Sequence, residues 1–413
     1  MLFPSQDSFI MSFNPQLLRN DFPILNNKKF IYFDNACTTL RPQKVIEKGN
    51  QYYFEHPSCH NRAVHAFGKE TTREVELARD LAKNFINALY SSEIVFTRNA
   101  TESLNIVAHG LDLKKDDVIV TTSLEHNSNL IPWKEIANKK GIIHKVFNIN
   151  PSDEKFDLNA FKNFIHSEKV KLVSLIHVSH VTGMILPIKE IIQICHENQA
   201  KVLIDAAQSI SLLKIDVQEL DIDFLVFSLH KMFGPSGMGI LYAKKSELQK
   251  LNPLYLGGET VSDSYYDKYT LAEIPYRFEA GLQNYSGILA AGEAFQYVGE
   301  LKKQSIFDHE VKLNQIITDN LRKNTKVVIL GPQNPELRPS IVNFYIKEKD
   351  MGEISILLDK TKSIMVRSGV HCCHAWYHHH QLKPSLRLSL APYNTIEEAE
   401  LFNQTINGII QFL

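Results

Sequence analysis

The stretch FSLHKMFGPSGMGILY (227–242) begins with the end of an apolar run that has the character of a buried strand. A histidine and a lysine, His230 and Lys231, follow that run directly, and the chain then passes through glycines and a proline. Such a loop is rigid enough to hold a side chain at the mouth of the strand. A lysine held in this way is a candidate for forming a Schiff base with a carbonyl compound, whereas an isolated lysine is usually a surface residue.

This strand is one of five short apolar segments of the same kind. They are rich in β-branched residues and bounded by turn or polar residues, as expected of strands buried on both faces. They lie at residues 94–97, 116–123, 171–179, 200–207 and 223–230. Helical patterns separate them, for example at residues 73–89 and 188–198. This alternation predicts βαβ units with a mainly parallel sheet, and therefore an α/β fold.

The pattern changes after about residue 295. A long helical run at 301–323 leads to strand-like segments at 340–346 and 363–369, and an amphipathic helix begins near Ile396. These features are typical of a smaller α+β domain. We therefore predict three parts, namely an N-terminal segment of residues 1–26 that packs with the small domain, a large domain of residues 27–295 and a small domain of residues 296–413.

The composition argues against several classes of protein. The 413 residues are 44% hydrophobic and 22% charged, and the formal net charge is −1. Basic and acidic residues are mixed along the chain, so no basic surface for nucleic acid or anionic membrane is expected. No apolar run reaches the roughly 18 residues of a spanning helix, and the N-terminus lacks a signal-peptide pattern. The five cysteines then favour free thiols and a cytoplasmic location.

An aspartate and a glutamine accompany the lysine. Asp205 and Gln208 lie in IDAAQS (204–209), at the end of the strand before the lysine. In a parallel sheet, Lys231 and the pair of Asp205 and Gln208 all lie at the carboxyl ends of strands, where α/β proteins bind ligands. This pair suits pyridoxal 5'-phosphate, because Lys231 can hold its aldehyde as an aldimine and an aspartate keeps the pyridine nitrogen protonated. The alternative for Asp205 is a helix N-cap.

Two further strand ends carry residues that suit this cofactor. TRNATESLN (97–105) follows a strand and opens a helix, so the backbone amides near Ala100 and the hydroxyl of Thr101 can bind a phosphate. Taken alone, this motif is also an ordinary helix cap. LEHNSNLIPW (124–133) begins at another strand end, where His126 can stack on a ring or move protons.

Together, the motifs resemble those of the class V, fold-type I pyridoxal-phosphate enzymes, and among these the group II cysteine desulfurases. They are SLHKxxGPxGxGxLY, IDAAQS, FTRxxTESxN, LEHNSNxxPW and RFEAGxQN, and the resemblance extends from residue 31 to residue 395. It implies a seven-stranded, mainly parallel mixed sheet flanked by helices, and a homodimer with active sites at the subunit interface. It also implies desulfuration of L-cysteine to L-alanine, with the sulfur passing to an acceptor protein for iron–sulfur cluster or thio-cofactor synthesis.

The resemblance also implies a role for each site residue. Lys231 would hold the cofactor, Asp205 its pyridine nitrogen and Gln208 its phenolate oxygen, while His126 would stack on the ring. The phosphate would be held by Ala100, Thr101, Ser228 and His230. Residues on the substrate side would be Arg387, Arg367, Arg62, His65 and Asn35.

The loop VRSGVHCCH (366–374) matches the position of the family's persulfide-forming cysteine, which makes Cys372 the expected sulfur acceptor. Its thiolate would attack the substrate sulfur, so that alanine leaves and the enzyme keeps a persulfide. Because an ordinary thiol has a pKa of about 8.5, His371 or nearby cations would have to favour the thiolate. Arg387 matches the arginine that binds the substrate carboxylate, for which a bidentate guanidinium is well suited. Lys231, Cys372 and His126 are thus the expected catalytic residues.

Several alternatives remain open from the sequence. Cys372 and Cys373 can be small buried residues. They can also form a zinc site with neighbouring histidines, namely His371, His374, His378, His379 and His380, although no pair of ligands with zinc-finger spacing frames them and we expect no metal. Selenocysteine lyase activity, another class V reaction such as transamination, or a non-catalytic scaffold are the functional alternatives.

Three positions depart from the desulfurase pattern. His180 stands where the family usually has an asparagine beside the cofactor's oxygen, and a histidine can still donate a hydrogen bond. Leu282 replaces a threonine that reaches the phosphate in the partner subunit, so either Gln283 or Asn284 substitutes for it or phosphate affinity falls. YLGGET (255–260) has one glycine fewer than the usual run.

Overall fold

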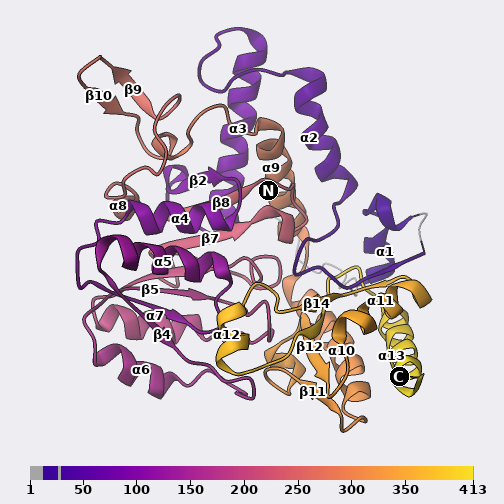
Figure 1. The fold of residues 1–413 in the computed structure, drawn as a ribbon. Coiled ribbons are helices and arrows are strands. Elements are labelled where there is room, and N and C mark those ends of the chain that lie inside the picture. Colours follow the sequence, from indigo (N-terminus) through magenta and orange to yellow (C-terminus); the bar gives the residue numbers. More distant parts are fainter. Residues whose placement is uncertain (1–12, 27–28, 413) are drawn as a thin grey trace, which may run out of the picture.

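The computed structural model describes residues 13–26 and 29–412, and its largest element is a seven-stranded sheet (Figure 1). The strand order is β2-β8-β7-β6-β5-β3-β4. Strand β8 runs antiparallel to both of its neighbours, and the other pairs are parallel. The predicted mainly parallel mixed sheet is therefore confirmed. The strands are β2 (Ile94–Thr97), β3 (Val118–Thr122), β4 (Ile143–Phe147), β5 (Val170–Ile176), β6 (Lys201–Asp205), β7 (Phe224–Ser228) and β8 (Gly239–Ala243).

Helices cover both faces of this sheet. Because side chains alternate along a strand, Ile119 packs with the cluster of one face, whereas Val118 and Val120 pack with that of the other. The first face carries α4 (Ala100–Gly110) and α5 (Asn127–Lys140). The second carries α3 (Ala66–Phe85), α6 (Leu158–His166), α7 (Ile188–Glu197) and α9 (Tyr285–Glu300). Helices α2 (Gln43–Glu55) and α8 (Lys245–Leu248) complete this part of the chain.

A second, four-stranded sheet lies in the C-terminal part of the chain, with the order β11-β12-β15-β14 and all pairs antiparallel. Helices α10, α11 and α13 share one apolar cluster with it. The strands are β11 (Val327–Ile329), β12 (Ile341–Ile346), β14 (Arg367–Gly369) and β15 (Ser385–Ser389). The helices are α10 (Lys303–Leu321), α11 (Met351–Lys362), α12 (His374–His379) and α13 (Ile396–Phe412).

The segment predicted as one strand at 363–369 is instead two short strands with different partners. Strand β13 (Ile364–Met365) pairs in parallel with β1 (Ile31–Tyr32), while β14 pairs with β15. Val366 lies between the two strands, after the segment that pairs with β1 and before the segment that pairs with β15. A sequence pattern does not reveal a change of partner, because the choice of neighbouring strand depends on tertiary packing.

The N-terminal part of the chain contacts the small domain. Arg19, at the end of α1 (Pro15–Arg19), pairs with Glu398 of α13 at 2.7 Å. Phe33 belongs to the apolar cluster of the second sheet, although it lies in the range 27–295 assigned to the large domain. The exact domain division therefore stays a prediction, and residues 1–12 of the N-terminal segment lie outside the described residues.

A hairpin of β9 (Val261–Ser264) and β10 (Tyr269–Leu271) projects from the large domain at the upper left of Figure 1. Tyr265, Tyr266 and Tyr269 on this hairpin are exposed. In the part of the chain that the structure describes, no helix combines the length and apolarity needed to cross a bilayer.

Candidate active site

A pocket of about 260 Å³ lies where the parallel strands of the large sheet end. Strand β6 ends at Asp205, β7 leads into a short 3-10 helix that carries Lys231, and β3 leads to His126. This is the edge at which α/β sheets bind ligands. The pocket is lined by Ala36, Cys37, Asn99, Ala100, Thr101, His126, Ser128, Ile176, Val178, His180, Asp205, Ala207, Gln208, Ser228, His230, Lys231, Arg367, His371, Cys372 and Arg387.

The amine of Lys231 has an environment that favours its neutral form. Burial lowers its pKa, and the charge of Arg387 acts in the same direction, while Asp205 opposes both. A neutral amine has a free lone pair, which is what attack on an aldehyde carbon requires. The lysine therefore fits the role of a Schiff-base former.

Asp205 lies buried opposite the lysine. Its carboxylate accepts a hydrogen bond from the backbone N–H of Ala207 at 2.9 Å, and burial raises its pKa. A buried carboxylate is costly unless a cation or hydrogen-bond donor meets it. The protonated ring nitrogen of pyridoxal phosphate would be such a donor, so this residue fits the cofactor.

The start of α4 provides a site for the phosphate group. The backbone N–H of Ala100 donates to Oγ of Ser228 at 2.8 Å, and Oγ1 of Thr101 lies 2.7 Å from Oγ of Ser128. A β-carbon on Gly239 would lie 2.6 Å from the backbone of Asn99, so only a glycine in β8 lets this helix start so close to the sheet. Backbone amides and hydroxyls at a helix N-terminus are a suitable set of phosphate donors.

Two histidine rings form one wall of the pocket. The ring centroids of His126 and His180 are 4.9 Å apart. Nδ1 of His126 accepts the backbone N–H of Ser128, and burial together with Lys231 and Arg387 lowers its pKa to about 4, so the ring is neutral at pH 7. Nε2 of His180 is buried and has no hydrogen-bond partner among the described residues, which leaves it able to contact a bound ligand.

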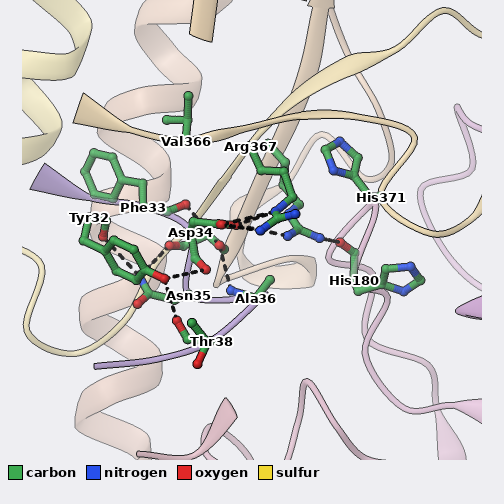
Figure 2. Close-up of polar contacts among 12 residues, drawn as sticks. Tyr32, Phe33, Asp34, Asn35, Ala36, Thr38, His180, Val366, Arg367 and His371 are labelled. Carbon is green, nitrogen blue, oxygen red and sulfur yellow. Dashed lines mark hydrogen bonds and ion pairs between the residues drawn. The ribbon is translucent and has the colours of Figure 1, made fainter. Parts of the chain in front are cut away.

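Two arginines line the pocket beside these histidines. Arg387 comes from β15 and is 3% exposed, and its Nη1 donates to the carbonyl of His180 at 2.8 Å. Arg367 comes from β14 and reaches Asp34, as Figure 2 shows. The structure thus brings both predicted arginines together at the antiparallel pair β14–β15.

Cys372 lies on a tight turn at the mouth of the pocket. His371 and Cys372 both have positive φ angles, 49° and 58°, and the carbonyl of Cys372 accepts the backbone N–H of Asn127 at 2.8 Å. The Cys372 side chain is exposed, whereas Cys373 is buried with Sγ directed at the carbonyl of Glu125. Burial raises the pKa of the Cys373 thiol, so of the two only Cys372 suits a nucleophile.

Gln208 and His230 also line the pocket. Nε2 of Gln208 donates to the carbonyl of Ala36 at 2.9 Å. Burial, together with Lys231 and Arg41, lowers the pKa of His230 to about 4. Both side chains are therefore available as neutral contacts for a ligand.

Three predicted substrate-side residues do not line the pocket. Arg62 is exposed and pairs with Glu259 at 2.7 Å, and His65 caps α3. The amide of Asn35 is used within the protein, where it donates to the carbonyl of Ser389 at 2.7 Å. Their assigned roles stay predictions, and Asn35 serves here to hold the segment after β1.

Sequence reasoning missed Asp34, which pairs with the pocket arginines, and Cys37, which lines the pocket. Both lie in the segment after β1, and the only signal for them was an acidic residue next to a strand end. Nothing in the sequence indicated that arginines more than 300 positions later would meet it.

Leu282 and its neighbours lie outside the pocket lining. Leu282 is 70% exposed, Gln283 donates to the carbonyl of Ala280, and Asn284 caps α9. Over residues 13–26 and 29–412, no group of three His, Cys, Asp or Glu side chains is arranged to hold a metal ion. The cysteine–histidine cluster of the loop therefore does not form a preassembled zinc site in the described structure.

A model of the aminotransferase class-V family matches residues 31–402, which is most of the chain. The chain belongs to the aminotransferase class-V family. This confirms the family predicted from the motifs, and it agrees with a site built to hold pyridoxal phosphate.

Relatives within the family are similar over nearly their whole length. A probable cysteine desulfurase from Synechocystis sp. is 37% identical over 404 residues, covering 96% of this chain and 95% of its own. A cysteine desulfurase from Escherichia coli is 34% identical and covers 94% and 97%. The solved structure of a cysteine desulfurase from Thermococcus onnurineus superposes with a TM-score of 0.91 at 35% identity, covering 97% of this chain and 98% of the other.

Proposed function

We propose that this protein is a pyridoxal-phosphate-dependent cysteine desulfurase, which converts L-cysteine to L-alanine and keeps the sulfur as a persulfide on Cys372. One observation carries the proposal. The exposed thiol of Cys372, the amine of Lys231 and the guanidinium of Arg387 all line one pocket. A lysine for the cofactor, an arginine for a carboxylate and a thiol for sulfur are the three groups that this reaction needs.

The cofactor would be held at four points of the pocket. Lys231 would hold its aldehyde carbon, Asp205 would pair with the ring nitrogen, and Gln208 would donate to the phenolate oxygen. The N-terminal turn of α4, with Thr101, would bind the phosphate. When bound, pyridoxal phosphate withdraws electrons from the α-carbon of an amino acid.

The remaining side chains act on the substrate. Arg387 binds the carboxylate of L-cysteine and so directs its side chain toward the loop of Cys372. The thiolate of Cys372 attacks the substrate sulfur: a sulfur–sulfur bond forms, the bond between Cβ and sulfur breaks, and its electron pair stays with the carbon fragment. That fragment takes up protons and leaves as alanine, and Lys231 and His126 of the pocket lining would carry them.

We further propose that the protein is a cytoplasmic homodimer that passes its sulfur to an acceptor protein. Two observations support the location and the transfer to an acceptor. All five cysteines are free, as is usual in a reducing compartment. The exposed position of Cys372 leaves a persulfide there within reach of another protein.

The experiment is a paired assay of alanine and sulfide from L-cysteine under a reductant, with the wild-type protein and Cys372→Ser. The proposal predicts equal amounts of both products from the wild type, and loss of both in the variant. Alanine production that survives in Cys372→Ser would instead favour another class V reaction with Cys372 as a bystander. Selenocysteine lyase activity is tested in the same assay with L-selenocysteine as the substrate.

A further inference from the structure

A carboxylate lies between the two arginines of the pocket. Asp34 pairs with Arg367 through three contacts, with distances of 3.0, 3.1 and 2.7 Å between the carboxylate oxygens and the guanidinium nitrogens. Figure 2 shows this pair beside His371 and His180. Asp34 also lies 3.4 Å from Nη2 of Arg387. One negative charge therefore faces the two positive charges of the pocket arginines.

The two arginines share this carboxylate unequally. Arg367 makes two-pronged contacts with Asp34, a geometry that satisfies a guanidinium well. Arg387 makes one long contact, and its buried Nε has no hydrogen-bond partner among residues 13–26 and 29–412. Since a buried donor without a partner is costly, Arg387 is the guanidinium that gains most from an incoming carboxylate.

The cluster of Asp34, Arg367 and Arg387 has a formal charge of +1. Arg367 and Arg387 contribute two positive charges, and Asp34 removes one of them. We propose that Asp34 sets the charge selectivity of the pocket, by cancelling Arg367 so that one uncompensated guanidinium, that of Arg387, meets the substrate. Such a pocket matches an amino acid with one carboxylate and a neutral side chain, and it disfavours an amino acid with a second negative group. This inference rests on the proposed function, because it assumes that the pocket binds a free amino acid.

A purely structural role for Asp34 makes a different prediction. The Asp34–Arg367 pair also joins the segment after β1 to β14, so removing either partner could simply loosen the loop. In that case the two single variants would be impaired alike and the double variant at least as much. The charge model instead predicts opposite effects of the two substitutions, and their cancellation in the double variant.

The experiment compares two inhibitors of alanine formation from L-cysteine by the holoenzyme. L-Serine carries one carboxylate, like the substrate, and L-aspartate carries a second one. The ratio of their inhibition constants is measured for the wild type, Asp34→Asn, Arg367→Gln and the double variant. The cluster then carries charges of +1, +2, 0 and +1.

We expect Asp34→Asn to shift the ratio about tenfold in favour of L-aspartate, which corresponds to about 1.4 kcal/mol. Arg367→Gln should shift it in the opposite direction and raise the KM for L-cysteine, because Asp34 then pairs with Arg387. The double variant should return to within about twofold of the wild-type ratio. A matched control is Glu219→Gln, which removes one carboxylate from an exposed pair with Lys189 outside the pocket and should leave the ratio unchanged.

The inference is overturned if Asp34→Asn leaves the ratio unchanged, or if the double variant is shifted further than either single variant. A wild-type protein that forms no alanine from L-cysteine would overturn the proposed function itself. In that event direct binding of L-serine and L-aspartate by calorimetry would still show whether the ratio follows the charge of the cluster. Failure of the proposed function and failure of the inference are thus distinguishable.

Discussion

At the scale of single residues, burial and position together determine which lysine amine is reactive. It lowers the pKa of two lysines, Lys231 and Lys303, the latter to about 8. Nζ of Lys303 is already committed, since it donates to the carbonyls of Ile210 and Leu213 at 3.0 and 2.7 Å. Lys231 instead lines the pocket, where Asp205 lies near enough to influence its charge. A low pKa alone therefore does not define the cofactor lysine, and its position in the pocket does.

The first prediction concerns this choice. Borohydride reduction of the protein in the presence of pyridoxal phosphate should fix the cofactor on the peptide that contains Lys231, as read by mass spectrometry. Lys231→Ala should remove this label and lower alanine formation by about a thousandfold or more, because it removes the amine that holds the cofactor. A label found on Lys303 in place of Lys231 would contradict the assignment.

At the scale of secondary-structure elements, α10 carries an acidic residue toward the large domain. Glu310 lines a small cavity that also borders Gln208 and Lys231, and it accepts a hydrogen bond from Ser340. Burial raises the pKa of Glu310 from 4.5 to about 8, and the bond from Ser340 only partly opposes this. The carboxyl is therefore mainly protonated at pH 7, and it occupies the contact between the two sheets in its neutral form.

The second prediction follows from the sign of this shift. Because the folded pKa lies above the unfolded one, the stability from protonated Glu310 is complete below about pH 4.5 and is lost as the pH rises through 8. The glutamine of Glu310→Gln does not titrate. The free energy of unfolding of this variant, relative to that of the wild type, should therefore increase by about 1.4 kcal/mol per pH unit from pH 5 to pH 8. Urea unfolding at several pH values measures this gain. A difference that does not vary with pH would show that Glu310 is not buried in its neutral form.

The elements also show what the sequence could predict. Strand ends were predictable because buried parallel strands are short apolar runs, and Asp205 and Lys231 follow such runs directly. The ion pairs of Asp34 were not, because they depend on β14 and β15 pairing in a register that sets Arg367 opposite Arg387. Register and partner choice depend on packing across the whole domain, and local pattern carries little information about them.

At the scale of the whole molecule, apolar side chains gather on the surface near the end of α2 and the start of α3. Tyr53, Phe54, Val64 and Phe67 are exposed, Phe54 and Val64 by more than four-fifths. Large exposed apolar groups close together in the chain are typical of a protein interface. We take this surface as part of the proposed homodimer contact.

The third prediction tests that contact. The wild-type protein should sediment as a dimer, and Val64→Asp should shift it toward the monomer, because a carboxylate loses its hydration in an apolar interface. Asp263→Asn, on the exposed hairpin strand β9, provides a control in which the charge change lies elsewhere. A wild-type protein that sediments as a monomer at assay concentration would refute the proposed dimer.

The most direct test of the account is the mass of the Cys372 peptide after the holoenzyme has reacted with L-cysteine in the absence of reductant. The account predicts the gain of one sulfur atom on this peptide, in step with the first equivalent of alanine, and no gain on the peptides of Cys37 or Cys195. Alanine formed while the Cys372 peptide keeps its original mass would contradict the account, since the sulfur would then leave by a route that does not involve this thiol.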